Sequence, residues 1–139
     1  MGYRIFPDGR LKGDRVPDGF RALILEPEEM LPCVGQGAIG IETRANDSEV
    51  AEICDRLNHT NTQQCVLAER TFLRVLGGGC QSPVGAYAHV LGHQLRLRAV
   101  VFEGEKMTRV EGKRTLKEGA ALGEELAARV QRGSREGNS

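Results

Sequence analysis

The chain has 139 residues, a length that suits one domain of ordinary size or pieces of more than one. Its 19 basic residues balance its 19 acidic ones, which argues against a nucleic-acid binder, because such a protein needs a basic excess. No apolar run approaches the roughly 20 residues of a membrane-spanning helix, and the N-terminus has no signal-peptide pattern. We therefore expect a cytoplasmic protein with neither a nucleic-acid nor a membrane partner.

The N-terminal part of the chain contains few elements that could pack together. Residues 1–19 have the composition of a loop, and residues 20–25 and 38–43 have the length and apolar character of strands. A helix is expected over residues 47–58, capped by Asn46 or Asp47. These elements are too few to complete a sheet layer, so we expect partial segments of two α/β domains that extend beyond this chain.

Residues 60–77 are expected to form a helix that opens with a capping box at 60–63 and ends at Gly77. Its apolar stripe includes Cys65, and the apolar face of the preceding helix includes Cys54, so both thiols are expected in the core. Disulfides are not expected in a reducing compartment. The cysteines and histidines show no metal-ligand spacing, so no metal site is expected.

Three strands are expected next, over residues 84–91, 94–102 and 107–114. The connections between them are short, which predicts an antiparallel meander. A second capping box at 115–118 opens a last helix, and residues 133–139 are expected to be a disordered tail. The predicted fold class is α+β, with a three-stranded antiparallel sheet covered by helices on one face.

Arg96 and Arg98 fall on the polar face of the second predicted strand. They could bind carboxylates, but a solvated strand face is the expected role. Gly35-x-Gly37-x-x-Gly40 formally fits a dinucleotide-binding fingerprint. It leads into a strand instead of joining a strand to a helix, so its context excludes that function. Glycines at these positions also let a strand cross between domains.

Cys80 follows the three glycines at 77–79 and precedes Pro83, in a loop where side chains cannot crowd the backbone. One interpretation is a buried cysteine after a helix end. A phosphatase-type loop would need arginine at position 86, where Ala86 stands. A Cys–His nucleophile would need His89 or His93 to face the thiol, and nothing in the pattern aims either one. The remaining interpretation is covalent attachment of a carbon electrophile as a thioether, since a thiolate is a soft, strong nucleophile.

Two segments carry a resemblance to a known family. Residues 76–88 resemble the cofactor-attachment loop of the hydroxymethylbilane synthases, also called porphobilinogen deaminases, and residues 31–42 resemble that family's second signature. The match extends from about residue 30 to residue 131. The resemblance implies a transferase of porphyrin and haem biosynthesis that joins four porphobilinogen molecules with release of ammonia. The growing polypyrrole is built on a dipyrromethane primer, linked as a thioether to Cys80.

The resemblance also implies a domain organisation. Residues 1–33 would be the tail of the second domain, 34–58 the returning strand and helix of the first, and 60–132 the cofactor-bearing C-terminal domain. The family's catalytic aspartate and most of its substrate-binding cations lie upstream, so no catalytic residue is expected here. We expect this fragment to be inactive by itself, to need the missing N-terminal domains, and to lack the cofactor when isolated. Beside Cys80, the residues expected near the cofactor are Gly78, Gly79, Gln36 and Gly37.

Two alternatives to that function remain at this level. The first is a non-catalytic binding or regulatory module with the same α+β fold. The second is a cysteine-dependent hydrolase.

Overall fold

The structure is a computed structural model that describes residues 3–79 and 82–136, with side chains described as far as residue 133. The chain divides into two compact units, residues 1–30 and residues 31–139. Each unit is described separately below.

The first unit contains a short antiparallel hairpin in the region expected to be loop. Strands β1 (Tyr3–Ile5) and β2 (Leu11–Gly13) pair with each other. The strand expected at residues 20–25 is not formed, and only an isolated bridge joins Arg21 to Arg10. Leu23 remains 83% exposed. Ala22 N–H still donates to Gly9 O at 2.8 Å. A strand needs a neighbour for its backbone groups and a surface for its side chains, and the described part of this unit pairs no strand with residues 23–25.

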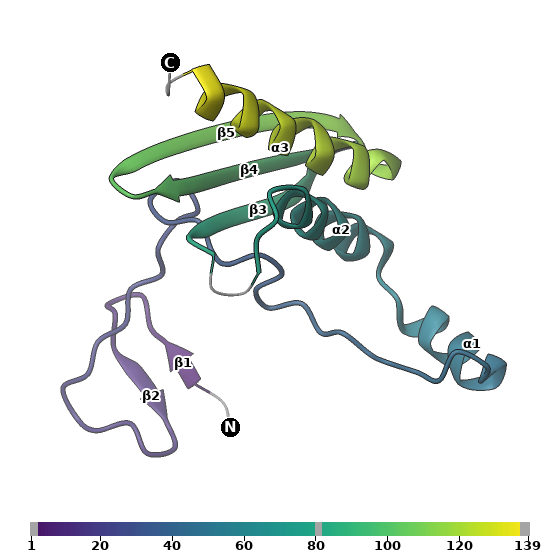
Figure 1. Ribbon diagram of the computed structural model, residues 1–139. Coiled ribbons are helices and arrows are strands. Elements are labelled where there is room, and N and C mark those ends of the chain that lie inside the picture. Colours follow the sequence, from purple (N-terminus) through teal and green to yellow (C-terminus); the bar gives the residue numbers. More distant parts are fainter. Residues whose placement is uncertain (1–2, 80–81, 137–139) are drawn as a thin grey trace. The chain divides into compact units, whose positions relative to one another are not determined.

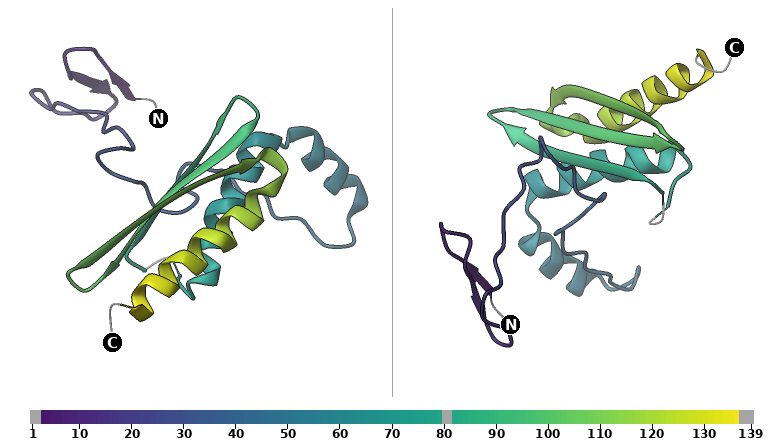
Figure 2. Two further views of the ribbon diagram at one scale, coloured as in Figure 1. Left: turned by 90° about the horizontal axis from the view of Figure 1, so that it is seen from above. Right: turned by 90° about the vertical axis from the view of Figure 1, so that its left-hand side faces the viewer.

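The second unit is a three-stranded sheet covered on one face by two helices. Helix α2 (Thr60–Val75) precedes strands β3 (Val84–Leu91), β4 (Gln94–Glu103) and β5 (Lys106–Thr115). The turn η1 (Leu116–Glu118) leads into helix α3 (Gly119–Glu136). The strands lie in the order β3-β4-β5, all antiparallel (Figure 1), and α2 and α3 cover the same face (Figure 2). The predicted meander and fold class are confirmed.

The alternation along β4 produces the core. Leu95, Leu97, Ala99 and Val101 point toward the helices and are buried. They pack with Phe72 of α2 and with α3 side chains, in a cluster that contains Leu122, Leu126 and Val130. The two hairpin turns begin with Gly92 and Gly104, whose φ angles of 61° and 62° suit tight two-residue turns. None of the helices in the described chain has the length and apolar character needed to span a bilayer.

Helices α2 and α3 lie unusually close to each other at Gly123. A Cβ at that position would overlap the carbonyl oxygen of Ala68 and lie 2.9 Å from the backbone nitrogen of Phe72. The helix pair therefore requires glycine here, although glycine lowers helix propensity.

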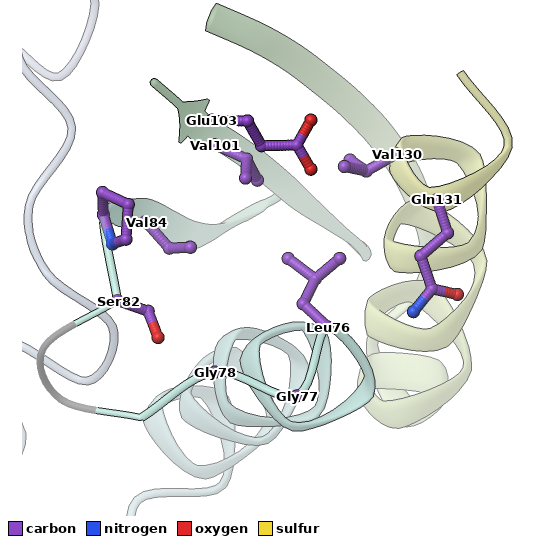
Figure 3. Close-up of a pocket in the computed structure, with 10 residues that line it drawn as sticks. Leu76, Gly77, Gly78, Ser82, Val84, Val101, Glu103, Val130 and Gln131 are labelled. Atoms are coloured by element: carbon purple, nitrogen blue, oxygen red, sulfur yellow. The ribbon is translucent and has the colours of Figure 1, made fainter. Parts of the chain in front are cut away.

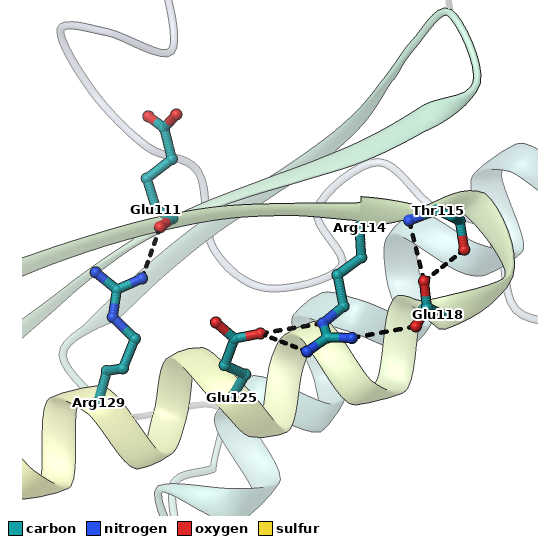
Figure 4. A network of polar contacts seen from close by, with 6 residues as sticks. All are labelled: Glu111, Arg114, Thr115, Glu118, Glu125 and Arg129. Carbon is teal, nitrogen blue, oxygen red and sulfur yellow. Dashed lines mark hydrogen bonds and ion pairs between the residues drawn. The ribbon is translucent and has the colours of Figure 1, made fainter.

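A polar network fastens α3 to β5 (Figure 4). Arg114 donates to Glu118 at 3.1 Å and to Glu125 at 2.9 Å. Arg129 donates to the backbone oxygen of Glu111 at 3.0 Å. The Thr115–Glu118 capping box is present, as the sequence predicts. These exposed groups set the direction of α3, while the buried apolar face supplies most of the stabilisation.

The start of α2 and the end of α3 differ from expectation. The N-cap of α2 is His59, one residue before the expected capping residue Thr60, and its Nδ1 accepts from Thr62 N–H at 3.4 Å. The helix therefore begins at Thr60 itself, and the capping box expected at 60–63 does not open it. Helix α3 continues to Glu136, so the disordered tail predicted from residue 133 is wrong for residues 133–136. Gly133 is not among the positive-φ glycines of the described chain and does not stop the helix. Residues 137–139 lie outside the described residues.

Residues 38–58 lack the packing that the sequence suggests. Residues 38–43 are all described and form no strand, and Ile39 is 92% exposed. Helix α1 (Ser48–Leu57) is capped by Asp47 as predicted, but within the described chain it buries none of its residues. Cys54 is therefore not in a core, because no element covers the apolar face of α1. Cys65 is half-buried against the core cluster.

The close packing at Gly123 predicts opposite effects for two glycine substitutions in α3. We expect Gly123→Ala to lower the free energy of unfolding by about 1–3 kcal/mol, because the new methyl group displaces α2. Gly133→Ala is the matched control, since an added Cβ there meets no described atom within 4 Å. Its better helix propensity should raise stability by at most about 1 kcal/mol. Urea unfolding of both variants measures this, and equal effects would contradict the described helix packing.

Candidate functional site

The glycines after α2 form a hydrogen-bonded helix end. Gly77 has a φ of 75°, and its N–H donates to Arg74 O at 3.0 Å. Gly78 N–H donates to Leu73 O at 3.1 Å. These two bonds are those of a Schellman motif, which satisfies the last carbonyls of the helix and reverses the chain. The expected end of the helix at Gly77 is confirmed.

Two hydrogen bonds join the residues that flank Cys80 and Gln81 in the loop that follows. Gly79 N–H donates to Ser82 Oγ at 2.8 Å, and Ser82 N–H donates to Gly79 O at 2.9 Å. A Cβ at Gly78 would lie 2.6 Å from Leu73 Cδ1 and 2.8 Å from Ser82 Oγ. Gly78 therefore allows Ser82 to pack against the end of α2. Cys80 lies outside the described residues, so the position of its thiol remains a prediction.

A hollow of about 410 Å³ lies beneath this loop (Figure 3). Leu76, Val101 and Val130 point into it from the end of α2, from β4 and from α3. Gln131, at its edge, donates from Nε2 to Val75 O at 3.0 Å. The hollow is lined mostly by apolar residues, and Glu103 adds one carboxylate to its lining.

The segment that carries the second signature lies along the outer edge of β3. Ala86 N–H donates to Pro32 O at 3.0 Å, and Cys33 forms a bridge with Gly85. A Cβ at Gly85 would lie 3.1 Å from Leu31 Cβ. The glycine thus lets the segment approach β3 closely. The two signatures, separated by more than thirty residues in the sequence, meet at the start of β3.

A buried carboxylate joins this segment to the sheet. Glu69 on α2 is only 6% exposed. Its Oε2 accepts from Gly35 N–H at 2.7 Å, and its Oε1 accepts from Ala88 N–H at 2.8 Å. Sequence reasoning did not identify Glu69 as a site residue. The sequence did contain a signal for it, because Glu69 lies next to Ala68 and near Phe72 on the face of the helix that is expected to be buried, where a charged residue is unusual.

Burial raises the pKa of two side chains in this region, Glu69 and Cys65. Removal from water raises the pKa of Glu69, and the two backbone donors offset part of that increase. Burial raises the pKa of the Cys65 thiol, and the nearby Glu69 carboxylate adds to the effect. Cys65 is therefore a weak nucleophile, which agrees with its expected role as a packing residue.

Gln36 and Gly37 line a second hollow, of about 330 Å³, together with Cys33, Cys65 and His89. Two successive turns shape the segment here, because Gln36 N–H donates to Cys33 O and Ala38 N–H donates to Gly35 O. The loop glycine Gly78 lines the first hollow instead. The structure thus places both sets of expected cofactor neighbours in one compact unit, but at different hollows.

The two histidines near Cys80 in sequence differ in position. His93 lies in the turn at the far end of β3, and an eight-residue strand spans roughly 26 Å. This distance excludes His93 as the base for a thiol in the loop before β3. His89 lies on β3 and stacks on Tyr87, with ring centroids 5.3 Å apart.

Arg96 and Arg98 lie on the sheet face opposite the helices. Arg96 forms a bidentate pair with Glu111, with N–O distances of 2.9 and 2.7 Å. The Arg98 guanidinium lies 6.0 Å from the centroid of the Tyr87 ring. Both side chains are engaged with neighbours on this face, which fits the expected solvated strand surface better than a carboxylate-binding role.

The loop geometry predicts a sharp difference between two adjacent glycines. Gly78→Ala should lower the free energy of unfolding by about 1 kcal/mol, because the new Cβ forces the Leu73 side chain and the Ser82 hydroxyl to move and disturbs the bond from Gly79 N–H to Ser82 Oγ. Gly79→Ala should change it by no more than about 0.5 kcal/mol, since an added Cβ there meets no described atom within 4 Å. Chemical denaturation of the two variants checks this. Equal destabilisation by both would show that the loop is packed differently.

The raised pKa of Glu69 predicts a pH dependence of stability. The folded state holds the proton more tightly than the unfolded chain, whose carboxyl has its ordinary pKa of 4.5. Stability from this group is therefore full below 4.5, falls as the pH rises toward the folded pKa, and is constant above it. Glu69→Gln removes this titration. We expect the free energy of unfolding of wild type, minus that of Glu69→Gln, to decrease as the pH rises from 4 to 8, and urea unfolding measures it. A difference that grows in favour of wild type would show that the folded state lowers the pKa of Glu69, and would contradict the raised pKa.

Comparison with known proteins identifies relatives of both parts of the chain. A family model described as the C-terminal domain of porphobilinogen deaminase matches residues 63–132. A second, described as the dipyromethane cofactor binding domain of porphobilinogen deaminase, matches residues 10–52. The chain is 56% identical over 78 residues to the porphobilinogen deaminase of Chlorobium limicola, covering 56% of this chain and 25% of that protein. It is 47% identical over 105 residues to that of Chlorobium phaeobacteroides strain BS1, covering 76% and 30%. The chain thus spans less than a third of the length of these curated relatives.

Proposed function

The chain belongs to the porphobilinogen deaminase family, and from this we propose that it is the C-terminal part of a hydroxymethylbilane synthase and carries the cofactor-attachment loop. In this proposal the whole enzyme joins four porphobilinogen units, releases ammonia and acts in the cytoplasm. Its partners are porphobilinogen and the growing polypyrrole.

The closed loop between Gly78 and Ser82 is the observation that carries the proposal. Gly79 and Ser82, the described flanks of Cys80, are joined by two hydrogen bonds, and Gly78 and Ser82 line the hollow at the end of α2. A covalent anchor benefits from a loop held in this way, because the group it holds is then positioned without a further loss of freedom.

The loop fits the attachment of a bulky group such as dipyrromethane. An added Cβ at Gly79 meets no described atom within 4 Å, so one side of the loop is open. We assign the thioether to Cys80, and we place Gly78, Gly79, Gln36 and Gly37 as its neighbours. When bound, dipyrromethane would supply the end to which pyrrole units are added. The residues of this chain would hold and orient it.

The groups that carry out proton transfer are proposed to lie in other parts of the protein. Catalysis of this condensation requires general acid–base groups and cations for the substrate carboxylates, and no such roles are assigned to residues of this chain. The exposed apolar side chains of Leu23 and Ile39, and the uncovered apolar face of α1, support further domains that pack on them. We accordingly assign residues 1–33 and 34–58 to the second and first domains, and we propose that the isolated chain is inactive and free of cofactor.

A chimeric enzyme tests this function. Residues 31–139 would replace the matching C-terminal part of the Chlorobium limicola enzyme, to which the chain is 56% identical over 78 residues. We expect the chimera to convert porphobilinogen to a tetrapyrrole and to carry the mass of a dipyrromethane. Cys80→Ser should abolish both, because oxygen does not replace the thioether sulfur, and Cys65→Ser should retain both. The isolated chain should form no tetrapyrrole.

Two results would contradict the proposal. A folded but inactive chimera would favour the non-catalytic binding module. Full activity and an unchanged cofactor mass in Cys80→Ser would assign the attachment to another residue.

A further inference from the structure

We propose that Glu69 is a positioning residue that fastens residues 31–38 to α2 and β3, so that the segment with Gln36 and Gly37 keeps a fixed position beside the start of β3. The consequence for catalysis rests on the proposed function. The fastening itself does not, because it follows from the contacts of one buried side chain.

The first part of the argument concerns the edge of the sheet. Strand β3 pairs with β4 on one side only, so its outward-facing N–H groups need other acceptors. Pro32 O accepts the outward N–H of Ala86. The segment then turns away, and Glu69 Oε1 accepts the next outward N–H, that of Ala88. The carboxylate thus accepts an N–H that a fourth strand would otherwise bind, at a position where the segment has already turned away from β3.

The second part concerns the turn in the segment. Gly35 has a φ of 71°, and Gln36 N–H donates back to Cys33 O. Glu69 Oε2 accepts the N–H of Gly35 within this turn, at 2.7 Å. Because the two oxygens belong to one carboxylate, the turn, β3 and α2 are held at a fixed spacing.

The third part concerns specificity for a carboxylate. Two N–H donors face two oxygens that are almost fully withdrawn from water. A glutamine has one acceptor and one donor group, so it can satisfy only one of the two amides. The other would be left buried without an acceptor or would move into solvent. The expected effect of losing Glu69 is therefore local release of residues 31–38.

A positioning role follows from where these elements lead. Strand β3 begins directly after the loop of residues 78–83, and the fastened segment carries Gln36 and Gly37. Because the segment is bonded to β3, and β3 continues directly from this loop, the position of Gln36 and Gly37 is tied to the end of the loop. Without Glu69, the three-stranded sheet and helices α2 and α3 would keep their core while residues 31–38 lost their fixed position along β3.

Hydrogen exchange measured by mass spectrometry on the 139-residue chain tests the fastening. In Glu69→Gln, we expect the amides of residues 31–38 or 86–90 to exchange about tenfold faster than in wild type. In Glu69→Leu, both sets should exchange faster. Peptides from residues 94–102 should be unchanged, since β4 is held by strands on both sides. Glu52→Gln, on the exposed surface of α1, is the matched control and should change neither set.

The outcomes separate the possible roles. Unchanged exchange of residues 31–38 and 86–90 in Glu69→Gln would overturn the proposal. Faster exchange throughout residues 84–115 would also overturn it, because Glu69 would then support the core and not the segment. If Glu69→Leu does not fold, Glu69→Gln alone decides.

The chimera tests the consequence for catalysis. Glu69→Gln in the chimera should lower turnover at least severalfold while the dipyrromethane mass stays attached. Unchanged turnover beside faster exchange would contradict the catalytic part of the proposal. An inactive parent chimera together with the expected exchange pattern would instead count against the proposed function and leave the fastening supported.

Discussion

The outer edge of β3 imposes the constraint on which the site depends. This strand has a neighbour on one side only, and the N–H groups along its other side must still find acceptors. Pro32 and Glu69 supply them, the first from the backbone and the second from a helix. The Pro32 contact, together with the second oxygen of Glu69, which accepts from Gly35 N–H, brings the 31–38 segment next to the strand that leaves the cysteine loop. Satisfying the edge and assembling the site are thus one structural event.

The sheet and its two helices were predictable because their signals are local. Alternation along residues 94–102, glycine-containing turns at 92–93 and 104–105, and the capping box at Thr115 each act within a few residues. The alternation of apolar residues along the strands and their helical spacing in α2 and α3 then predicted which faces pack together in the core. The contact of α2 with α3 at Gly123 was not predictable, because it depends on how two distant helices cross.

The strands expected at residues 20–25 and 38–43 show where local signals fail. Both segments are apolar and of strand length, yet in the described chain neither pairs with a neighbouring strand along its length. Residues 20–25 have only the bridge of Arg21 to Arg10 and the bond from Ala22 N–H to Gly9 O. The apolar face of α1 is similar: Cys54 is only partly buried, and no residue of this helix is fully buried among the described residues. A side-chain pattern reports which face is suited to burial, but burial requires a second surface.

The sequence by itself determined the cysteine loop, its glycines, the family and the α+β unit, because short-range backbone preferences and long motifs carry that information. It also led us to expect Gln36 and Gly37 near the loop, whereas in the structure they line a different hollow from Gly78. Only the tertiary structure decided that Glu69 joins the two signatures, since its two acceptor contacts reach residues 34 positions before it and 19 after it. Sequence patterns describe neighbours within an element. A carboxylate buried between three elements is defined only once those elements have packed, because its burial and its donors are properties of the folded chain.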